Sequence, residues 1–201
     1  MTPESHASLR QKILDEALGL VASEGVGGVT MRALAHKLGY SPATIYLYFR
    51  NKDDLFQEIA RYGNVRLMQA TEGCSAIADA AAARDEFLRI VVDFAFQNPR
   101  LYQIMCSVDL LPFFADRNLE EPGRRVGDRY RDIYVRGVAA GELATPNPEH
   151  DLIIDWSMIY GFITLVLTGQ LPHPRLPDAS VSELRDVVLD AIRRRTAPAP
   201  P

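Results

Sequence analysis

The sequence predicts an all-helical (all-α) protein. Apolar residues recur at helical spacing, and glycine and proline interrupt the segments, whereas no alternating run is long enough to predict a sheet. The chain has 201 residues, of which 47% are hydrophobic and 24% are charged. These are ordinary globular values, so the chain can bury a core as one large domain or two small ones, and wholesale disorder is excluded.

The first helix is predicted over about 8–24. Leu9, Ile13 and Leu20 belong to its apolar stripe. Gly25 follows the last periodic position, and glycine readily adopts the left-handed backbone that ends a helix.

Two shorter helices follow. Thr30 can cap a helix over 31–38, and Gly39 ends it. Ser41 is a second hydroxyl cap and is followed by proline, whose missing N–H costs nothing in a first turn. A short third helix is therefore predicted to run to about Phe49.

The rest of the chain is also predicted to be helical. Asn51 caps a long fourth helix. Further helices are expected after the alanine-rich segment 76–84 and after Asn98-Pro99, and over about 124–140, 149–169 and 180–195. An irregular link is expected over 110–123. We expect an N-terminal domain over 8–52 with a connecting helix to about 72, a C-terminal domain over 73–196, and a flexible tail over 197–201.

The second and third helices have the proportions of a helix-turn-helix. Ala35 is small where the helices cross, Gly39 accepts the sharp turn, and Ile45 can fill the angle between them. Any small helical hairpin could show these residues, so the pattern is only moderately specific.

The distribution of charge supports an anionic partner. A net charge of −4 and a pI near 5.6 disfavour a nucleic-acid binder at first reading. Between residues 25 and 52, however, there are four basic residues and no acidic one: Arg32, Lys37, Arg50 and Lys52. This window carries +4 and leaves −8 for the rest of the chain. It is either a chance gap on a solvated face or an electrostatic footprint for an anionic partner.

Several residues in this window have side chains that can donate hydrogen bonds. They can reach phosphates or base edges, and they are Thr30, Arg32, Ser41, Thr44, Tyr46, Tyr48 and Lys52. Each tyrosine could instead be a packing residue. Tyr46 and Tyr48 are two residues apart on a helix, so both cannot share the buried face of Ile45.

The stretch from Val29 to Leu55, with its Gly-Tyr-Ser and Ile-Tyr-Leu-Tyr-Phe-Arg-Asn-Lys-Asp-Asp-Leu segments, strongly resembles the DNA-binding domain of the TetR family of bacterial transcriptional regulators. The similarity covers about residues 10–62. It implies that the third helix enters the major groove, with Ser41, Ala43, Thr44 and Tyr46 facing the groove. Tyr48 and Lys52 would then contact phosphates, and Thr30 and Arg32 would lie near the DNA backbone or the groove edge.

The C-terminal half resembles a subgroup named for a Trp-His-Gly pattern. The residues that carry this likeness are the segment from Asn98 to Met105 and Trp156, Tyr160 and Gly161. Tyr160 stands where the pattern has histidine, so chemistry that needs that histidine does not transfer.

The family resemblance also implies an effector pocket among the middle helices. Its candidate lining residues are Phe94, Met105, Phe113, Tyr130, Tyr134, Trp156 and Tyr160. Ordinary core packing is the alternative. A mostly apolar lining favours a small lipophilic ligand, and no cationic cluster indicates a phosphorylated one.

A homodimer through the last two helices is expected. The apolar segment from Trp156 to Leu167 and the amphipathic helix that carries Val187 and Ile192 offer more apolar surface than one small core needs. The resemblance implies the same two-fold dimer, which would bind a near-palindromic double-stranded DNA operator.

Other classes of protein fit less well. Cys74 and Cys106 alone make neither a disulfide framework nor a zinc site. The histidines are scattered and no phosphate-binding glycine loop occurs, so neither enzyme activity, a cofactor nor a metal is expected. No signal-peptide pattern is present, so we expect a cytoplasmic protein. The uncharged segment 156–172 is short and polar for a bilayer span, so we expect it to be buried.

The sequence therefore predicts a repressor that a small lipophilic ligand releases from a palindromic operator. The alternative is a ligand-independent DNA-binding dimer whose C-terminal half serves only dimerisation.

Overall fold

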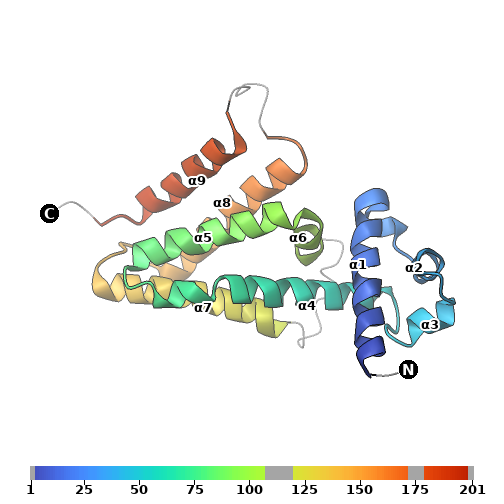
Figure 1. Ribbon diagram of the computed structural model, residues 1–201. Helices are drawn as coiled ribbons and strands as arrows, with labels where there is room; N and C mark the ends of the chain where they lie inside the picture. Colours follow the sequence, from blue (N-terminus) through green and yellow to red (C-terminus); the bar gives the residue numbers. More distant parts are fainter. Residues whose placement is uncertain (1–2, 107–119, 172–178, 199–201) are drawn as a thin grey trace. The chain divides into compact units, whose positions relative to one another are not determined.

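The computed structural model describes residues 3–106, 120–171 and 179–198, and every regular element in these ranges is a helix (Figure 1). This confirms the all-helical prediction. Contacts within the chain divide it into two compact units. Unit 1 comprises residues 1–64 and 100–120, and unit 2 comprises residues 65–99 and 121–201. The predicted domain boundaries remain a prediction.

Unit 1 begins with helix α1, Pro3–Gly28, which is interrupted at Gly25 (φ 73°, ψ 177°). The interruption lies where the sequence predicts the end of the helix, because a positive φ is unfavourable for residues with a Cβ. The helix starts five residues earlier than predicted. Proline suits that start, since its fixed φ is helical and its missing N–H has no intrahelical partner there.

The two predicted caps of the helix-turn-helix are confirmed. Thr30 Oγ1 accepts a hydrogen bond from Ala33 N at 3.0 Å and caps α2, Met31–Leu38. Ser41 Oγ accepts one from Thr44 N at 3.2 Å and caps α3, Pro42–Tyr46. Between them Gly39 adopts the left-handed conformation (φ 72°, ψ 27°), which turns the chain sharply.

The helices of unit 1 enclose a small apolar core. Ile45 is completely buried, as expected for the residue that fills the angle between α2 and α3. Leu34 and Ala35 of α2 and Ile13 of α1 pack in the same core. Helix α4, Lys52–Ala70, supplies residues to both units, and α6, Pro99–Met105, belongs to unit 1 from Arg100 onward.

Unit 2 contains a 3₁₀-helix and four longer helices. These are η1 (Glu72–Ala76), α5 (Ala80–Gln97), α7 (Glu120–Ala140), α8 (Pro148–Leu167) and α9 (Val181–Arg195). The last two lie within two residues of their predicted bounds. The irregular link predicted over 110–123 is wrong for residues 120–123, which open α7, and its other residues lie outside the described ranges. Pro122 is compatible with helix because backbone N–H groups in a first turn have no intrahelical acceptor.

Helix α8 is apolar but only partly buried within the chain. It is long and apolar enough to cross a membrane by length and composition alone, and 22% of its most apolar window is buried. Asp155, Ile159, Phe162 and Ile163 face the core. Five large apolar side chains of α8 and α9 are exposed, and we call them together the apolar α8–α9 face: Ile153, Ile154, Trp156 and Leu165 of α8 with Val187 of α9. The predicted burial of this helix is therefore not achieved by the core of one chain.

Glu58 links α4 to α1 in unit 1. Its Oε1 lies 2.9 Å from Arg10 Nη1 and 2.6 Å from Arg61 Nη2. Burial alone would raise the pKa of Glu58, but the hydrogen bonds from Arg61 and Arg10 outweigh it and lower this pKa to about 2. A carboxylate with a depressed folded-state pKa stabilises the fold above its unfolded pKa of about 4.3, and the contribution is lost as pH falls towards 2.

We predict that Glu58→Gln lowers the free energy of unfolding by about 1–2 kcal/mol near neutral pH, after allowance for solvent screening. The difference from wild type should shrink as pH falls below about 4.5, because protonation makes the native side chain neutral too. Urea titrations at several pH values measure this difference in the free energy of unfolding. Glu72→Gln, which changes an exposed glutamate, is the control. A difference that does not change with pH would contradict this account.

Candidate functional site

The candidate DNA-binding residues lie on α2, α3 and the segments that follow α3, all in unit 1. We call Ser41, Ala43, Thr44 and Tyr46 the reading surface. Ser41, Ala43 and Tyr46 are exposed and Thr44 is half-buried, while Ile45 between them is completely buried. Burial of one side chain thus directs its neighbours outward, since successive helical residues point about 100° apart.

Two hydroxyl groups of the reading surface are held in place by each other. Ser41 Oγ and Thr44 Oγ1 are 2.9 Å apart and share a hydrogen bond, and Ser41 Oγ also accepts the backbone N–H of Thr44. One hydroxyl proton is used between them, so the other hydroxyl can still donate to DNA. The cap therefore both starts α3 and orients its first polar groups.

Lys52 is anchored at the start of α4. Its Nζ donates a hydrogen bond to the Val26 carbonyl at 2.8 Å and lies 5.5 Å from the centre of the Phe56 ring. An ammonium has three donors, so it can hold this carbonyl and still contact a phosphate. The hydroxyl oxygen of Tyr48 is buried, so a phosphate contact from Tyr48 would need its side chain to move.

Ion pairs with acids from outside the basic window reduce the positive charge that this window presents in the folded protein. Lys37 Nζ lies 3.6 Å from Glu16 of α1, and Arg50 lies 3.1 Å from Asp54 of α4. Both acids lie outside the acid-free window. Among the described residues no carboxylate pairs with Arg32 or Lys52, so these two cations are the main candidates for phosphate contacts.

Leu47 is an exposed residue that sequence reasoning missed. It is the C-cap of α3, and 79% of its surface is exposed, more than for Tyr46 at 51%. The spacing of the buried Ile45 and Phe49 already places residue 47 on the outer side. An exposed apolar side chain beside the reading surface can contact the methyl group of thymine.

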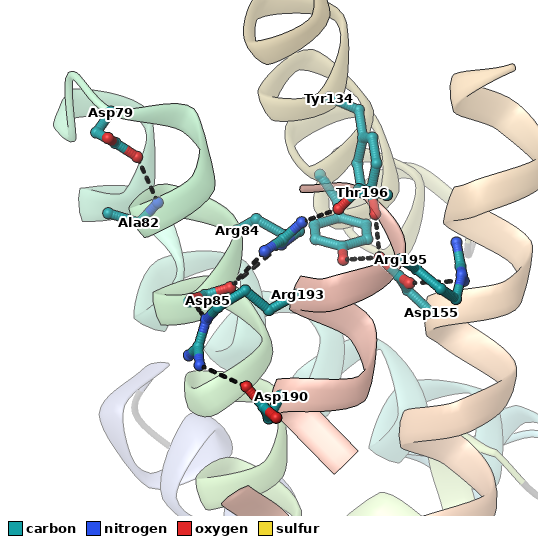
Figure 2. A network of polar contacts seen from close by, with 11 residues as sticks. Asp79, Ala82, Arg84, Asp85, Tyr134, Asp155, Asp190, Arg193, Arg195 and Thr196 are labelled. Atoms are coloured by element: carbon teal, nitrogen blue, oxygen red, sulfur yellow. Dashed lines mark hydrogen bonds and ion pairs between the residues drawn. The ribbon is translucent and has the colours of Figure 1, made fainter. Parts of the chain in front are cut away.

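Tyr130 and Tyr134, predicted to line an effector pocket, instead lie in a buried polar cluster in unit 2. Tyr130 Oη donates to Asp155 Oδ2 at 2.8 Å, and Tyr134 donates to the same oxygen. Figure 2 shows that Arg195 also approaches the Asp155 carboxyl, with Nη1 3.3 Å from Oδ1. Burial raises the pKa of Asp155, while the tyrosine hydrogen bonds and the arginine charges oppose that shift.

The same cluster reaches the end of α9 through Arg84. This arginine is completely buried on α5 and donates to Thr196 Oγ1 and to Asp85. The carbonyl of Thr196 in turn accepts Ala144 N at 2.9 Å. We call Arg84, Tyr130, Tyr134, Asp155, Arg195 and Thr196 the Asp155 cluster. Its tyrosines are core residues with satisfied hydroxyl groups.

The other predicted effector residues differ in exposure and belong to both units. Trp156 is 41% exposed, Tyr160 is half-buried, and Met105 belongs to unit 1. Phe113 lies outside the described residues. The predicted effector lining therefore stays a prediction.

Phe94 does line a cavity. This α4–α5 cavity has a volume of about 300 Å³ and lies in unit 2 between the C-terminal part of α4 and the second half of α5. Arg66 and Ala70 come from α4, while Asp93, Phe94 and Gln97 come from α5.

Two family models match the chain. The model described as bacterial regulatory proteins, tetR family, matches residues 13–59, which include the whole helix-turn-helix. The model described as the tetracycline repressor-like C-terminal domain matches residues 65–188. The second match alone covers more than half of the chain.

Known proteins agree with this assignment. The HTH-type transcriptional regulator AcrR of Shigella flexneri is 38% identical over 58 residues, which are 29% of this chain and 27% of AcrR. The HTH-type transcriptional repressor Rv1474c of Mycobacterium tuberculosis is 36% identical over 88 residues, 42% of this chain and 47% of that protein. The chain thus matches about half or less of these relatives' length. A solved structure of a protein of unknown function from Rhodococcus sp. RHA1 has a TM-score of 0.80 at 26% identity, covering 98% of this chain and 100% of that one.

We predict that Arg32→Gln weakens binding to all DNA sequences alike and lowers the slope of log K against log salt by about 0.9, because one phosphate contact is lost. Lys37→Gln is the matched control, since the charge of Lys37 is already offset by Glu16. Its slope should change by less than half as much. An equal change of this slope in the two variants would show that pairing with a carboxylate within the protein does not decide which cations contact DNA.

We predict that Thr44→Ala and Leu47→Ala each relax the preference at one position of the half-site. Loss of a base-edge or methyl contact costs about 1–3 kcal/mol of discrimination. Selection of bound sequences from a randomised operator measures the preference. An unchanged preference in both variants would remove these residues from base recognition.

Proposed function

The chain belongs to the TetR family of bacterial regulatory proteins, and on that basis we propose that it is a transcriptional repressor that a small ligand releases from its operator. The observation that carries the proposal is the exposed reading surface, held by the Ser41 cap beside the completely buried Ile45. The name of Rv1474c as a repressor supports negative regulation.

The proposed DNA contacts divide into two kinds. Those of the reading surface and Leu47 read base edges, and the remaining contacts, from Thr30, Arg32, Tyr48 and Lys52, position the duplex through its backbone. The domains proposed are a DNA-binding domain over 8–52, with its connecting helix to about 72, and a sensing and dimerisation domain over 73–196.

We assign the apolar α8–α9 face to a homodimer interface in the cytoplasm. Ile153 and Val187 are each 65% exposed in one chain, on two helices that pack against each other, and large exposed apolar side chains there favour a partner surface. A second copy buries the same face of both chains through a two-fold axis. The dimer presents two reading surfaces to half-sites that are about 34–36 Å apart, or a multiple of that distance.

Release follows from a shift between two arrangements of the dimer. A ligand that binds more tightly to the arrangement in which the two reading surfaces no longer fit both half-sites lowers the affinity for DNA. The α4–α5 cavity, at about 300 Å³, is within the size range of ligand sites and supports a sensor. The Asp155 cluster favours the alternative, a ligand-independent dimer, because the hydroxyl groups of Tyr130 and Tyr134 bind Asp155 rather than a ligand.

The proposed function is tested by selecting DNA that the full-length protein binds from a random pool. The expected product is an inverted repeat whose half-site centres are about one helical turn, or a multiple of it, apart. No enriched sequence, or an enriched site without two-fold symmetry, would contradict the proposal.

We predict that Val187→Glu converts the dimer to a monomer, because two charges would be buried without partners across the two-fold interface. Operator affinity should then fall at least about tenfold, since only one half-site is engaged at a time. Light scattering and DNA titration measure the two effects. Val135→Glu is the matched control, as Val135 is 48% exposed on α7 outside this face. A dimeric Val187→Glu protein would place the interface elsewhere.

A further inference from the structure

The segment that joins α1 to α2 begins with an unusual backbone conformation at Gly25. Its φ of 73° and ψ of 177° lie in a region that only glycine adopts readily. A Cβ on Gly25 would meet no atom within 4 Å, so the surrounding space does not require glycine. The requirement for glycine therefore comes from the backbone conformation alone, and such conformations gather at functional sites.

The residue after Gly25 carries the carbonyl that holds Lys52. Val26 O accepts a hydrogen bond from Lys52 Nζ at 2.8 Å and another from Val29 N at 3.4 Å. A carbonyl oxygen has two lone pairs, so it can accept both. The dihedral angles of Gly25 determine the direction in which the chain continues into Val26. The place of this carbonyl therefore depends on the conformation of Gly25.

Two contacts hold the ammonium of Lys52 at the start of α4. Besides the Val26 carbonyl, the ring of the completely buried Phe56 has its centre 5.5 Å from Nζ. The carbonyl takes one of the three N–H donors of the ammonium. A lysine side chain is otherwise flexible and loses conformational freedom when it binds a phosphate. Lys52 is already held in the free protein, so it binds a phosphate at a smaller entropic cost.

The same segment also leads to the cap of α2. Val29 is buried and is followed by Thr30, whose Oγ1 accepts Ala33 N and starts that helix. A change at Gly25 can therefore act on DNA binding by two routes, through Lys52 or through the position of α2. The two routes are separable, because only the first depends on the side chain of Lys52.

We propose that Gly25 is a positioning residue for DNA binding. Its backbone conformation places the Val26 carbonyl where it holds the Lys52 ammonium ready for a DNA phosphate. This inference rests on the proposed function, because it requires Lys52 to contact DNA. It adds a residue that has no polar side chain and acts on DNA only through another residue.

The test measures the affinity of the full-length protein for the operator selected from the random pool. Gly25→Ala should weaken binding at least about threefold, because Lys52 is no longer held before it meets a phosphate. Gly27→Ala is the matched control and should bind as wild type does, since a Cβ there also meets no atom within 4 Å and its φ is not positive. In the Lys52→Gln background, Gly25→Ala should have no further effect on affinity.

An equal loss of affinity from Gly25→Ala in both backgrounds, or no loss in either, would overturn the proposal. A Lys52→Gln protein that keeps the wild-type slope of log K against log salt would also overturn it, because Lys52 then contacts no phosphate. Where Gly25→Ala is too unstable to titrate, Gly25→Asn takes its place, since asparagine tolerates a positive φ better than alanine does.

A second measurement needs no DNA. In NMR spectra of the lysine ammonium groups, Lys52 should exchange its hydrogens slowly with water in wild type and in Gly27→Ala, and faster in Gly25→Ala, because a hydrogen-bonded N–H is protected. Fast exchange of Lys52 in wild type would overturn the proposal. Failure to select any operator would overturn the proposed function, whereas the NMR comparison still tests whether Gly25 positions Lys52.

Discussion

The carboxyl group of Asp155 organises unit 2. It is completely buried, and a buried polar group of this kind is tolerated only when its hydrogen bonds are satisfied. Two phenols of α7 and a guanidinium at the end of α9 meet it on α8, and Arg84 of α5 joins the same cluster through Thr196. Because Asp155 faces inward, Ile153, Ile154 and Trp156 point outward and form the apolar face that we assign to the dimer.

Unit 1 is organised by local hydrogen bonds instead. The Thr30 cap specifies where α2 begins, the left-handed Gly39 where it ends, and the Ser41 cap where α3 begins. Once Ile45 is buried between these helices, the neighbouring side chains have to face solvent. The proposed DNA-contacting residues of α3 therefore take their conformation from local interactions between Thr30 and Ile45.

The parts of the structure predicted from the sequence are those that depend on local chemistry. Helix caps, the turn and the order of the helices act over three or four residues, so their residue types reveal them. The pairing of Lys37 with Glu16, and of Tyr130 with Asp155, depends on packing between helices that are distant in sequence. For that reason the sequence did not reveal that Glu16 offsets the charge of Lys37, or that the hydroxyl groups of Tyr130 and Tyr134 bind Asp155. The exposure of Leu47 could have been inferred, because buried residues flank it at helical spacing.

The central claim is that only the helix-turn-helix face of an otherwise acidic protein binds DNA. Hydrogen–deuterium exchange of the full-length protein, with and without its selected operator, tests this most directly. The account predicts slower exchange in α2, α3 and the start of α4, and unchanged exchange in α5 and the exposed side of α7. Protection by DNA that is centred on α5 or α7, or no protection in α3, would contradict it.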